Sequence, residues 1–213
     1  ELTVFILADI SGSIDGGTRG VSKRDRITEL AAVLAFSAMG NNDKVGAILF
    51  SDRIEKFIPP KKGKSHVLRI IREIIEIEPE GKGTDITNAL DHFLTAMKKR
   101  TVSFLLSDFR DSGYEDLLKR AGRKHDFVAL KIEDPIDIDI PDVGWLPLKD
   151  HESGETKWMR TGSKKDRIRY RALELERSDN LKRAFARAGI DSTTIRTDMP
   201  YVKPLMQLFD RRG

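Results

Sequence analysis

Asp9, Ser11 and Ser13 bring three oxygen-bearing side chains onto one short turn that follows an apolar run. The run, residues 2–8, is apolar apart from one threonine, which is typical of a strand buried on both faces. Open α/β sheets bind their ligands at the carboxyl ends of strands, where this turn would lie. Carboxylate and hydroxyl oxygens suit Mg²⁺ or Mn²⁺ better than Zn²⁺ or Cu²⁺. The turn therefore predicts a site for a hard divalent cation.

Two later segments carry ligands of the same kind. Thr84 lies in a glycine-flanked loop just before a predicted helix, and Asp108 lies where the apolar strand predicted at 102–106 ends. If the strands are parallel neighbours, all three segments meet at one edge of the sheet. Two carboxylates would formally neutralise Mg²⁺, and neutral hydroxyls would fill further positions of its octahedral shell. The expected ligands are Asp9, Ser11, Ser13, Thr84 and Asp108.

Asp85 and Asp111 are candidates to orient waters or hydroxyls around such a metal. Each also has a structural alternative. Asp85 could simply favour the amino end of its helix, and Asp111 could cap the next helix. The residues themselves do not decide between these roles.

Strand-like and helix-like patterns alternate along the chain. Besides the first strand, we expect strands at 45–50, 54–58, 102–106, 127–132 and 192–196. We expect helices at 26–39, 64–77, 85–98, 114–121 and 163–188, and a last one from residue 201. This alternation favours a mostly parallel sheet with helices on both faces. One antiparallel edge strand, 54–58, would pair with 45–50 and would end at Pro59 and Pro60.

Residues 133–162 depart from this rhythm. The alternating residues 134–140 favour a half-buried strand or extended edge, because a Ca²⁺ loop of the EF-hand type would need a glycine and a terminal glutamate. A turn centred on Ser153 and Gly154 predicts a small hairpin. Trp145 and Trp158 flank this hairpin and could anchor a partner, although packing beneath it is the commoner role and the one we expect.

Composition excludes several classes of protein. The chain has no cysteine, so it has neither disulfides nor thiolate metal sites. It has 38 Lys and Arg against 34 Asp and Glu, with both signs interspersed, which favours a solvated surface over nucleic-acid binding. No apolar stretch is long enough to cross a bilayer. Because the chain opens on Glu1 directly at a strand, we expect it to be a fragment of a longer protein.

The ordered ligand set resembles the metal-ion-dependent adhesion site of a von Willebrand factor A (vWA) domain. Further segments resemble the bacterial "domain of unknown function fifty-eight" family over nearly all of the chain; these are residues 50–53, 59–66, 83–85, 106–109 and 198–209. The loop at 16–23 is longer and more basic than in that family's pattern. The resemblance implies a Rossmann-like α/β vWA fold in one domain, residues 1–213, with a hairpin elaboration at about 133–162.

The resemblance also implies a function. In adhesion sites the metal bridges two proteins by binding a carboxylate of the partner. Members of the family are often partnered with MoxR-type AAA+ ATPases, and some carry membrane helices before the vWA domain. We therefore expect a Mg²⁺ (or Mn²⁺) protein-binding module rather than an enzyme. Its partner would be a MoxR-type ATPase or a client, in protein complex assembly or maturation. We expect a cytoplasmic location, with a parent protein anchored through a preceding segment.

Two alternatives stay open. One is a Mg²⁺-dependent phosphohydrolase, but the haloacid-dehalogenase type needs a second aspartate at position 11, which is serine. The sequence contains neither a P-loop nor a Gly-x-Ser-x-Gly motif, and none of its four histidines has a triad context. The other is a basic nucleic-acid-binding module centred on residues 164–171, which we expect to be only the solvated start of a helix.

Overall fold

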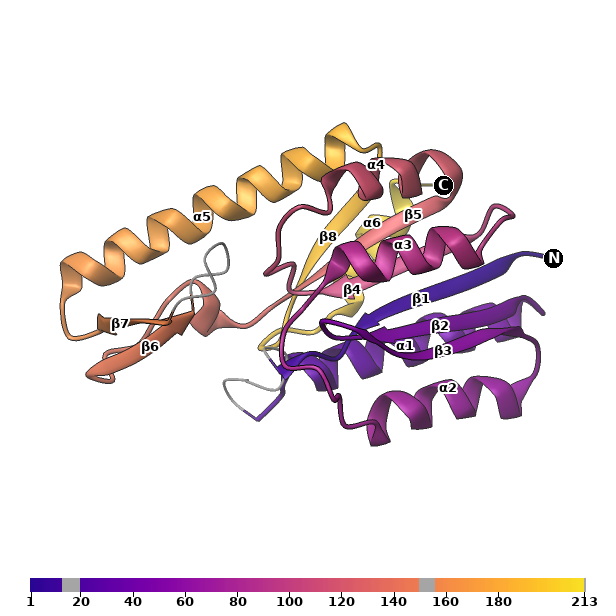
Figure 1. Cartoon of the computed structure of the whole chain (residues 1–213), viewed down its shortest axis with the longest axis horizontal. Coiled ribbons are helices and arrows are strands. Elements are labelled where there is room, and N and C mark those ends of the chain that lie inside the picture. Colours follow the sequence, from indigo (N-terminus) through magenta and orange to yellow (C-terminus); the bar gives the residue numbers. More distant parts are fainter. Residues whose placement is uncertain (13–19, 150–155, 213) are drawn as a thin grey trace.

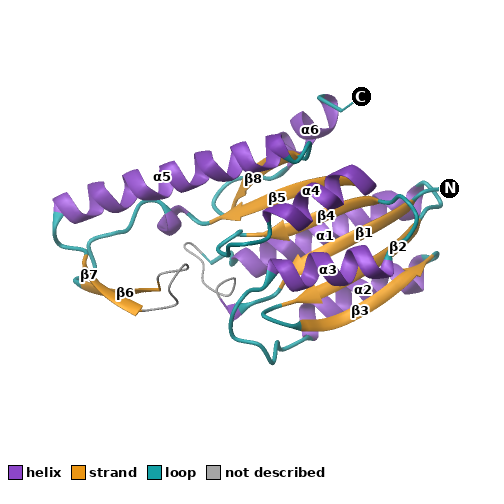
Figure 2. Cartoon of the chain, turned by 45° about the horizontal axis from the view of Figure 1, so that its top comes forward, coloured by secondary structure: helices purple, strands orange, loops and turns teal. Residues whose placement is uncertain are grey.

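A six-stranded sheet forms the centre of the molecule, with helices on both faces (Figures 1 and 2). The computed structural model describes residues 1–12, 20–149 and 156–212. The strand order is β3-β2-β1-β4-β5-β8, and all neighbours are parallel except β2 and β3. The strands are β1 (Thr3–Asp9), β2 (Lys44–Phe50), β3 (Ile54–Lys61), β4 (Val102–Ser107), β5 (Asp126–Glu133) and β8 (Asp191–Arg196). The predicted α/β fold with one antiparallel edge strand is confirmed.

The helices lie close to their expected positions. They are α1 (Lys23–Gly40), α2 (Lys64–Glu76), α3 (Ile86–Ala96), α4 (Glu115–Lys124), α5 (Lys164–Arg187) and α6 (Val202–Asp210). No helix among the described residues is both long and apolar enough to cross a membrane.

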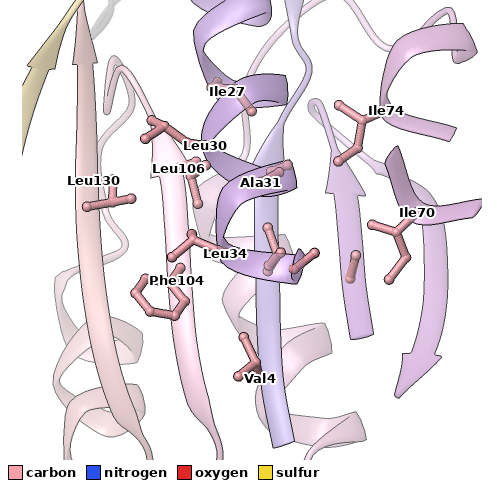
Figure 3. Close-up of a cluster of buried hydrophobic side chains, with 14 of the residues drawn as sticks. Val4, Ile27, Leu30, Ala31, Leu34, Ile70, Ile74, Phe104, Leu106 and Leu130 are labelled. Atoms are coloured by element: carbon pink, nitrogen blue, oxygen red, sulfur yellow. The ribbon is translucent and has the colours of Figure 1, made fainter. Parts of the chain in front are cut away.

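Strand β1 is apolar throughout because both of its faces are buried. Its side chains alternate, so that Val4 and Ile6 enter the cluster beneath α1 and α2, whereas Phe5 and Leu7 enter the cluster beneath α3 and α4. In Figure 3 the α1 side chains, among them Leu30, lie over the strands on the first of these faces. The strand that carries the candidate site is therefore held in the middle of the core.

The edge strand β3 runs through the two prolines that we expected to end it. Pairing with β2 is irregular there, since Val45 lies opposite Lys61 but Ala47 lies opposite Ile58. An edge strand tolerates proline because one side of its backbone has no neighbour to bond. Pro59 and Pro60 thus interrupt the ladder without ending the strand.

A short 3-10 helix, η2 (Pro135–Asp137), replaces the extended segment that we expected there. Asp134 caps it by accepting from the Ile136 N–H, and the Asp137 carboxylate accepts from the Asp134 N–H. Pro135 occupies the first helical position, where its missing N–H costs nothing. This reciprocal capping box outweighs the alternating pattern.

Strands β6 (Trp145–Lys149) and β7 (Thr156–Arg160) form the expected hairpin, separate from the main sheet. It lies beside the first turns of α5, which extend beyond the sheet (Figure 1). The tryptophans do not pack beneath it: Trp145 is 64% exposed and Trp158 65%. The expectation was wrong because a two-stranded sheet has no interior, and α5, which lies across a groove from the tryptophans, leaves both of them exposed. The turn around Ser153 lies outside the described residues.

Candidate metal site

Asp9 ends β1 as a fully buried carboxylate. One oxygen, Oδ2, accepts a hydrogen bond from Ser107 Oγ at 2.6 Å, and the other accepts from the Ser11 N–H at 3.0 Å. Ser107 is the last residue of the neighbouring strand β4. The residue before it, Leu106, pairs with Ala8 of β1 in the parallel register, so the two strands end side by side. The first carboxylate is thus fixed by its own turn and by the adjacent strand.

Thr84 lies against the same turn, with its Oγ1 donating to Ser11 Oγ at 2.8 Å. Its loop is held by the turn between β2 and β3. The Asp52 carboxylate accepts from the Gly83 N–H at 3.0 Å, and Glu55 accepts from the Gly81 N–H at 2.9 Å. A Cβ at Gly81 would overlap the side chains at the start of the β2–β3 turn, so only glycine allows this approach.

Asp108 follows β4 in a tight turn. Its Oδ1 accepts from the Arg110 N–H at 3.1 Å. Between them Phe109 has φ 56°, a left-handed conformation that is rare for a bulky residue. Buried contacts hold Phe109 there, with its ring 5.0 Å from that of Phe185 and 6.2 Å from that of Tyr114. The aromatic packing therefore stabilises the turn that presents Asp108.

The structure thus brings together four of the five expected ligands: Asp9, Ser11, Thr84 and Asp108. Ser13 lies outside the described residues.

Lys23, a residue that we did not predict for the site, contacts Asp108 directly. Its Nζ lies 3.0 Å from Asp108 Oδ2 and 2.8 Å from Asp137 Oδ2, and its side chain is only 4% exposed. Burial alone would lower the pKa of Lys23, but the two carboxylates outweigh it and leave the pKa above its ordinary value. The ammonium group is therefore charged and fixed between β4 and η2.

The charge network continues from Asp137 to α5. Arg110 Nη2 lies 3.4 Å from Asp137 Oδ1 and 3.2 Å from Glu174 Oε2. Burial opposes the charged form of Arg110, yet these carboxylates raise its pKa above the ordinary value. Lys23, Asp137 and Arg110 thus link the candidate site to the long helix.

The two carboxylates of the site have different electrostatic surroundings. Burial first, and then the nearby Asp108 charge, raise the pKa of Asp9 to about 7. Burial also opposes ionisation of Asp108, but Lys23 and Arg110 hold the pKa of that carboxyl below its usual range. Within the described residues the ion pairs of the site involve Asp108 and Asp137, and none involves Asp9. Asp9 is therefore the group whose charge a bound cation would neutralise.

The donor set fits a hard cation. Buried carboxylate and hydroxyl oxygens from three segments face one point, and no nitrogen or sulfur ligand is among them. No cluster of three or more His, Cys, Asp or Glu side chains suited to a metal occurs in the described ranges. Binding at this point would consequently depend on the serine and threonine hydroxyls.

Asp85 and Asp111 both bind the amino end of α3. Asp85 is its N-cap, accepting from the Asn88 N–H at 2.8 Å. Asp111 accepts from the Ile86 N–H, also at 2.8 Å, and so caps α3 rather than the helix after it. Burial raises the pKa of Asp111. These bonds account for both residues, while a role around a metal stays a prediction.

Residues 1–180 match the family described as "Protein of unknown function DUF58". The chain belongs to this family. It is similar to the uncharacterized protein Rv1480 of Mycobacterium tuberculosis, with 26% identity over 215 aligned residues that cover all of this chain and 68% of the relative. The family recognised in the sequence is thereby confirmed.

Among the solved structures that resemble the DUF58 chain are two that cover nearly all of it. One is an aerotolerance-related membrane protein from Bacteroides fragilis, with a TM-score of 0.62, 18% identity, and coverage of 99% of this chain and 100% of that one. The other is the SpRpn10 VWA domain, with a TM-score of 0.51, 12% identity, and coverage of 99% and 94%. At these identities the likeness concerns the fold, and it confirms the vWA architecture.

Sequence reasoning missed four residues of the site: Ser107, Lys23, Arg110 and Asp137. Ser107 had a usable signal, since it stands between an apolar strand and a candidate ligand. Asp137 had one in the Asp-Pro-x-Asp capping pattern. Lys23 had none, because it follows the capping residue Ser22 at the start of an amphipathic helix, where lysines are usually solvated.

Proposed function

We propose that this DUF58 chain binds Mg²⁺ or Mn²⁺ at Asp9, Ser11, Ser13, Thr84 and Asp108 and thereby holds a carboxylate of a partner protein. The observation that supports this most is the buried Asp9, which lies beside a second carboxylate and is in no ion pair among the described residues. Two like charges in a buried site are unfavourable unless a cation or a proton compensates them. A bound divalent ion would supply that charge and attract an acidic group from outside.

We propose further that the partner is a MoxR-type AAA+ ATPase or one of its clients, in assembly or maturation of protein complexes. This rests on the family resemblance. Residues 1–213 would act as a single cytoplasmic domain with residues 133–162 as its elaboration. The parent protein would be membrane-associated through another segment. The similarity in fold to a protein described as a membrane protein supports that association.

Binding rather than catalysis is the activity we propose for the site. A phosphohydrolase of the dehalogenase type would place a second carboxylate at position 11, where Ser11 accepts from Thr84. The described histidines have other contacts: His66 bonds the Val45 carbonyl, and His125 contacts Thr101. These surroundings favour a site that holds a cation over one that transfers protons.

Calorimetric titration with MgCl₂ or MnCl₂ tests the proposal. The wild type should bind one ion, and thermal unfolding should shift upward with Mg²⁺ relative to EDTA. Asp9→Asn and Thr84→Ala should each lose most of the affinity and most of the shift. The exposed Asp91→Asn on α3 is the matched control and should behave as the wild type.

Association with the partner is tested separately. A MoxR-type ATPase from the same organism should bind in Mg²⁺ and dissociate in EDTA. The cation site would be refuted if neither Mg²⁺ nor Mn²⁺ gave a heat of binding in the titration and neither raised the unfolding temperature. Metal binding without metal-dependent association would refute the partner while leaving the cation site intact.

A further inference from the structure

The hairpin β6–β7 and the first turns of α5 present an exposed aromatic surface; we call these residues, 143–149 and 156–173, the arm. Trp145 lies opposite Arg160 and Pro147 lies opposite Trp158, so the two tryptophans are diagonal neighbours on one face of the hairpin. On α5, Leu173 is 55% exposed. Exposed tryptophans close to further apolar side chains are typical of a binding surface.

This surface is hollowed rather than flat. A groove of about 490 Å³ lies between hairpin and helix. Trp145, Trp158, Tyr170 and Leu173 provide its apolar and aromatic lining, and Arg160, Arg169 and Asp166 also line it. A concave site of this size accommodates a few side chains of a partner.

The arm also holds a disproportionate share of the positive charge. Residues 143–173 contain eight basic and four acidic residues, a net charge of +4, which equals the net charge of the complete chain. The remaining residues therefore carry no net charge. Among the described residues no ion pair involves Arg160 or Arg169. The groove consequently favours an occupant of negative charge.

We propose that the groove docks an acidic protein segment, which inserts an apolar side chain between the tryptophans and Leu173 and pairs its carboxylates with Arg160 and Arg169. Tryptophan and arginine are the residues that most often dominate protein interfaces. Asp166 within the groove disfavours the continuous phosphate backbone of a nucleic acid. The concave shape disfavours a flat bilayer surface. This docking needs no metal and is independent of the cation site.

A second cleft, of about 770 Å³, extends from Asp108 along α5 to the hairpin. It shares Tyr170 and Leu173 with the groove. A partner bound in the groove is therefore adjacent to a continuous path toward the candidate cation site.

Tryptophan fluorescence tests the proposal directly, because Trp145 and Trp158 are the only tryptophans of the chain. The probe is a short synthetic peptide in which glutamates flank a phenylalanine and two leucines, titrated in EDTA to exclude the cation site. Emission should shift to shorter wavelength in a saturable manner, and the affinity should fall as salt is raised. A peptide with lysine in place of glutamate should give no shift.

Variants identify the groove as the binding site. Arg160→Glu combined with Arg169→Glu should weaken binding of the acidic peptide by about tenfold or more. Lys98→Glu combined with Lys99→Glu, the same charge change at an exposed position beyond α3, should leave it unchanged. Circular dichroism verifies that both double variants fold as the wild type does.

Four results would overturn the proposal. The acidic peptide could produce no shift. The double variant at the groove could bind as tightly as the wild type. Phosphatidylglycerol vesicles or a single-stranded oligonucleotide could produce the shift while the peptide does not. The shift could also occur with protein concentration alone, which would assign the surface to a second copy of the chain.

Discussion

Lys23 makes the candidate site more than a collection of oxygen ligands. Its ammonium group compensates Asp108 from inside the protein, so that one of the two carboxylates already has a partner while Asp9 has none of that kind among the described residues. A cation entering the site would share Asp108 with this lysine. The affinity of the site for metal should therefore depend on Lys23, although Lys23 cannot itself be a ligand as an ammonium ion.

Lys23→Met should destabilise the metal-free protein by at least about 3 kcal/mol, because it leaves the buried Asp108 carboxylate without its ion-pair partner, whereas Asp137 keeps Arg110. Mg²⁺ should then restore more stability to the variant than it adds to the wild type, since the metal no longer competes with the ammonium group. Urea unfolding in EDTA and in Mg²⁺ measures both effects.

The exposed Lys98→Met serves as the control for lysine removal. Equal stability of the Lys23→Met variant and the wild type in EDTA would contradict the buried ion pair. If Mg²⁺ raised the free energy of unfolding of the variant and of the wild type by the same amount, the metal and Lys23 would not compete for Asp108.

His125 provides a pH-dependent contribution to stability away from the site. Its Nδ1 lies 2.9 Å from Thr101 Oγ1, its buried Nε2 has no hydrogen-bond partner among the described residues, and its ring centre lies 4.6 Å from that of Phe93. Burial, together with the nearby positive charges of Lys124 and Arg100, lowers its pKa to about 4. The folded protein therefore holds this imidazole neutral.

Acidification should consequently remove the contribution that the neutral His125 makes to the stability of the wild type. The unfolded chain takes up a proton at His125 near pH 6.5 and the folded chain only near pH 4, so this contribution falls as the pH drops through this window. Between pH 7 and pH 5 His125 alone accounts for a fall of about 2 kcal/mol, whereas protonation of Asp9, whose pKa is raised to about 7, acts in the opposite direction in wild type and variant alike. The change in stability between the two pH values should therefore be more favourable in His125→Asn, which keeps an acceptor for Thr101 without a titrating group, than in the wild type. Denaturant unfolding at both pH values measures the difference, and equal changes in the two proteins would contradict the assignment.

At the level of loops and strands, the turn between β2 and β3 acts as a support for the Thr84 loop. Asp52 and Glu55 bind the backbone of that loop, and Asp85 N–H donates to the Ser51 carbonyl at 2.9 Å. The Phe-Ser-Asp-Arg segment that carried part of the family resemblance thus has a physical role. It positions a candidate ligand that is distant in sequence.

Gly81→Ala should therefore weaken Mg²⁺ binding by about tenfold, because the added methyl group would displace the loop that carries Thr84 from Ser51 and Asp52. Calorimetry measures the affinity. Gly40→Ala, where the new Cβ meets open space at the end of α1, is the matched control and should bind as the wild type does. Unchanged affinity in Gly81→Ala would show that the loop is not part of the cation site.

The strands and most helices could be predicted because each is specified by local patterns of apolar residues. Where prediction was wrong, a second local signal competed. Pro59 indicated a strand end, but the edge position of β3 removed the penalty. Alternation after Asp134 indicated an extended segment, but capping by Asp137 stabilised a 3-10 turn. Which of two competing local signals prevails depends on tertiary contacts, and a local sequence pattern does not contain these.

Across the molecule, topology was easier to predict than long-range contacts. Alternating strands and helices sufficed to place Asp9 and Asp108 at one edge, since parallel strands end together. The inward turn of Lys23 depends on η2, more than a hundred residues later. Likewise the helix expected at 163–188 is present as α5, yet Leu173 on it is exposed because the helix extends past the sheet. Periodicity identifies an apolar side chain but not whether anything covers it.

The prolines of β3 restrict how other proteins can engage this fold. Many proteins recruit extended peptides by β-augmentation, in which a new strand pairs with a free sheet edge. Pro59 and Pro60 of the edge strand β3 have no backbone N–H group. At these positions another chain therefore cannot form the hydrogen bonds of an added strand, which also disfavours aggregation through the sheet edge. Main-chain pairing at this border is therefore confined to the part of β3 that precedes the prolines, residues 54–58.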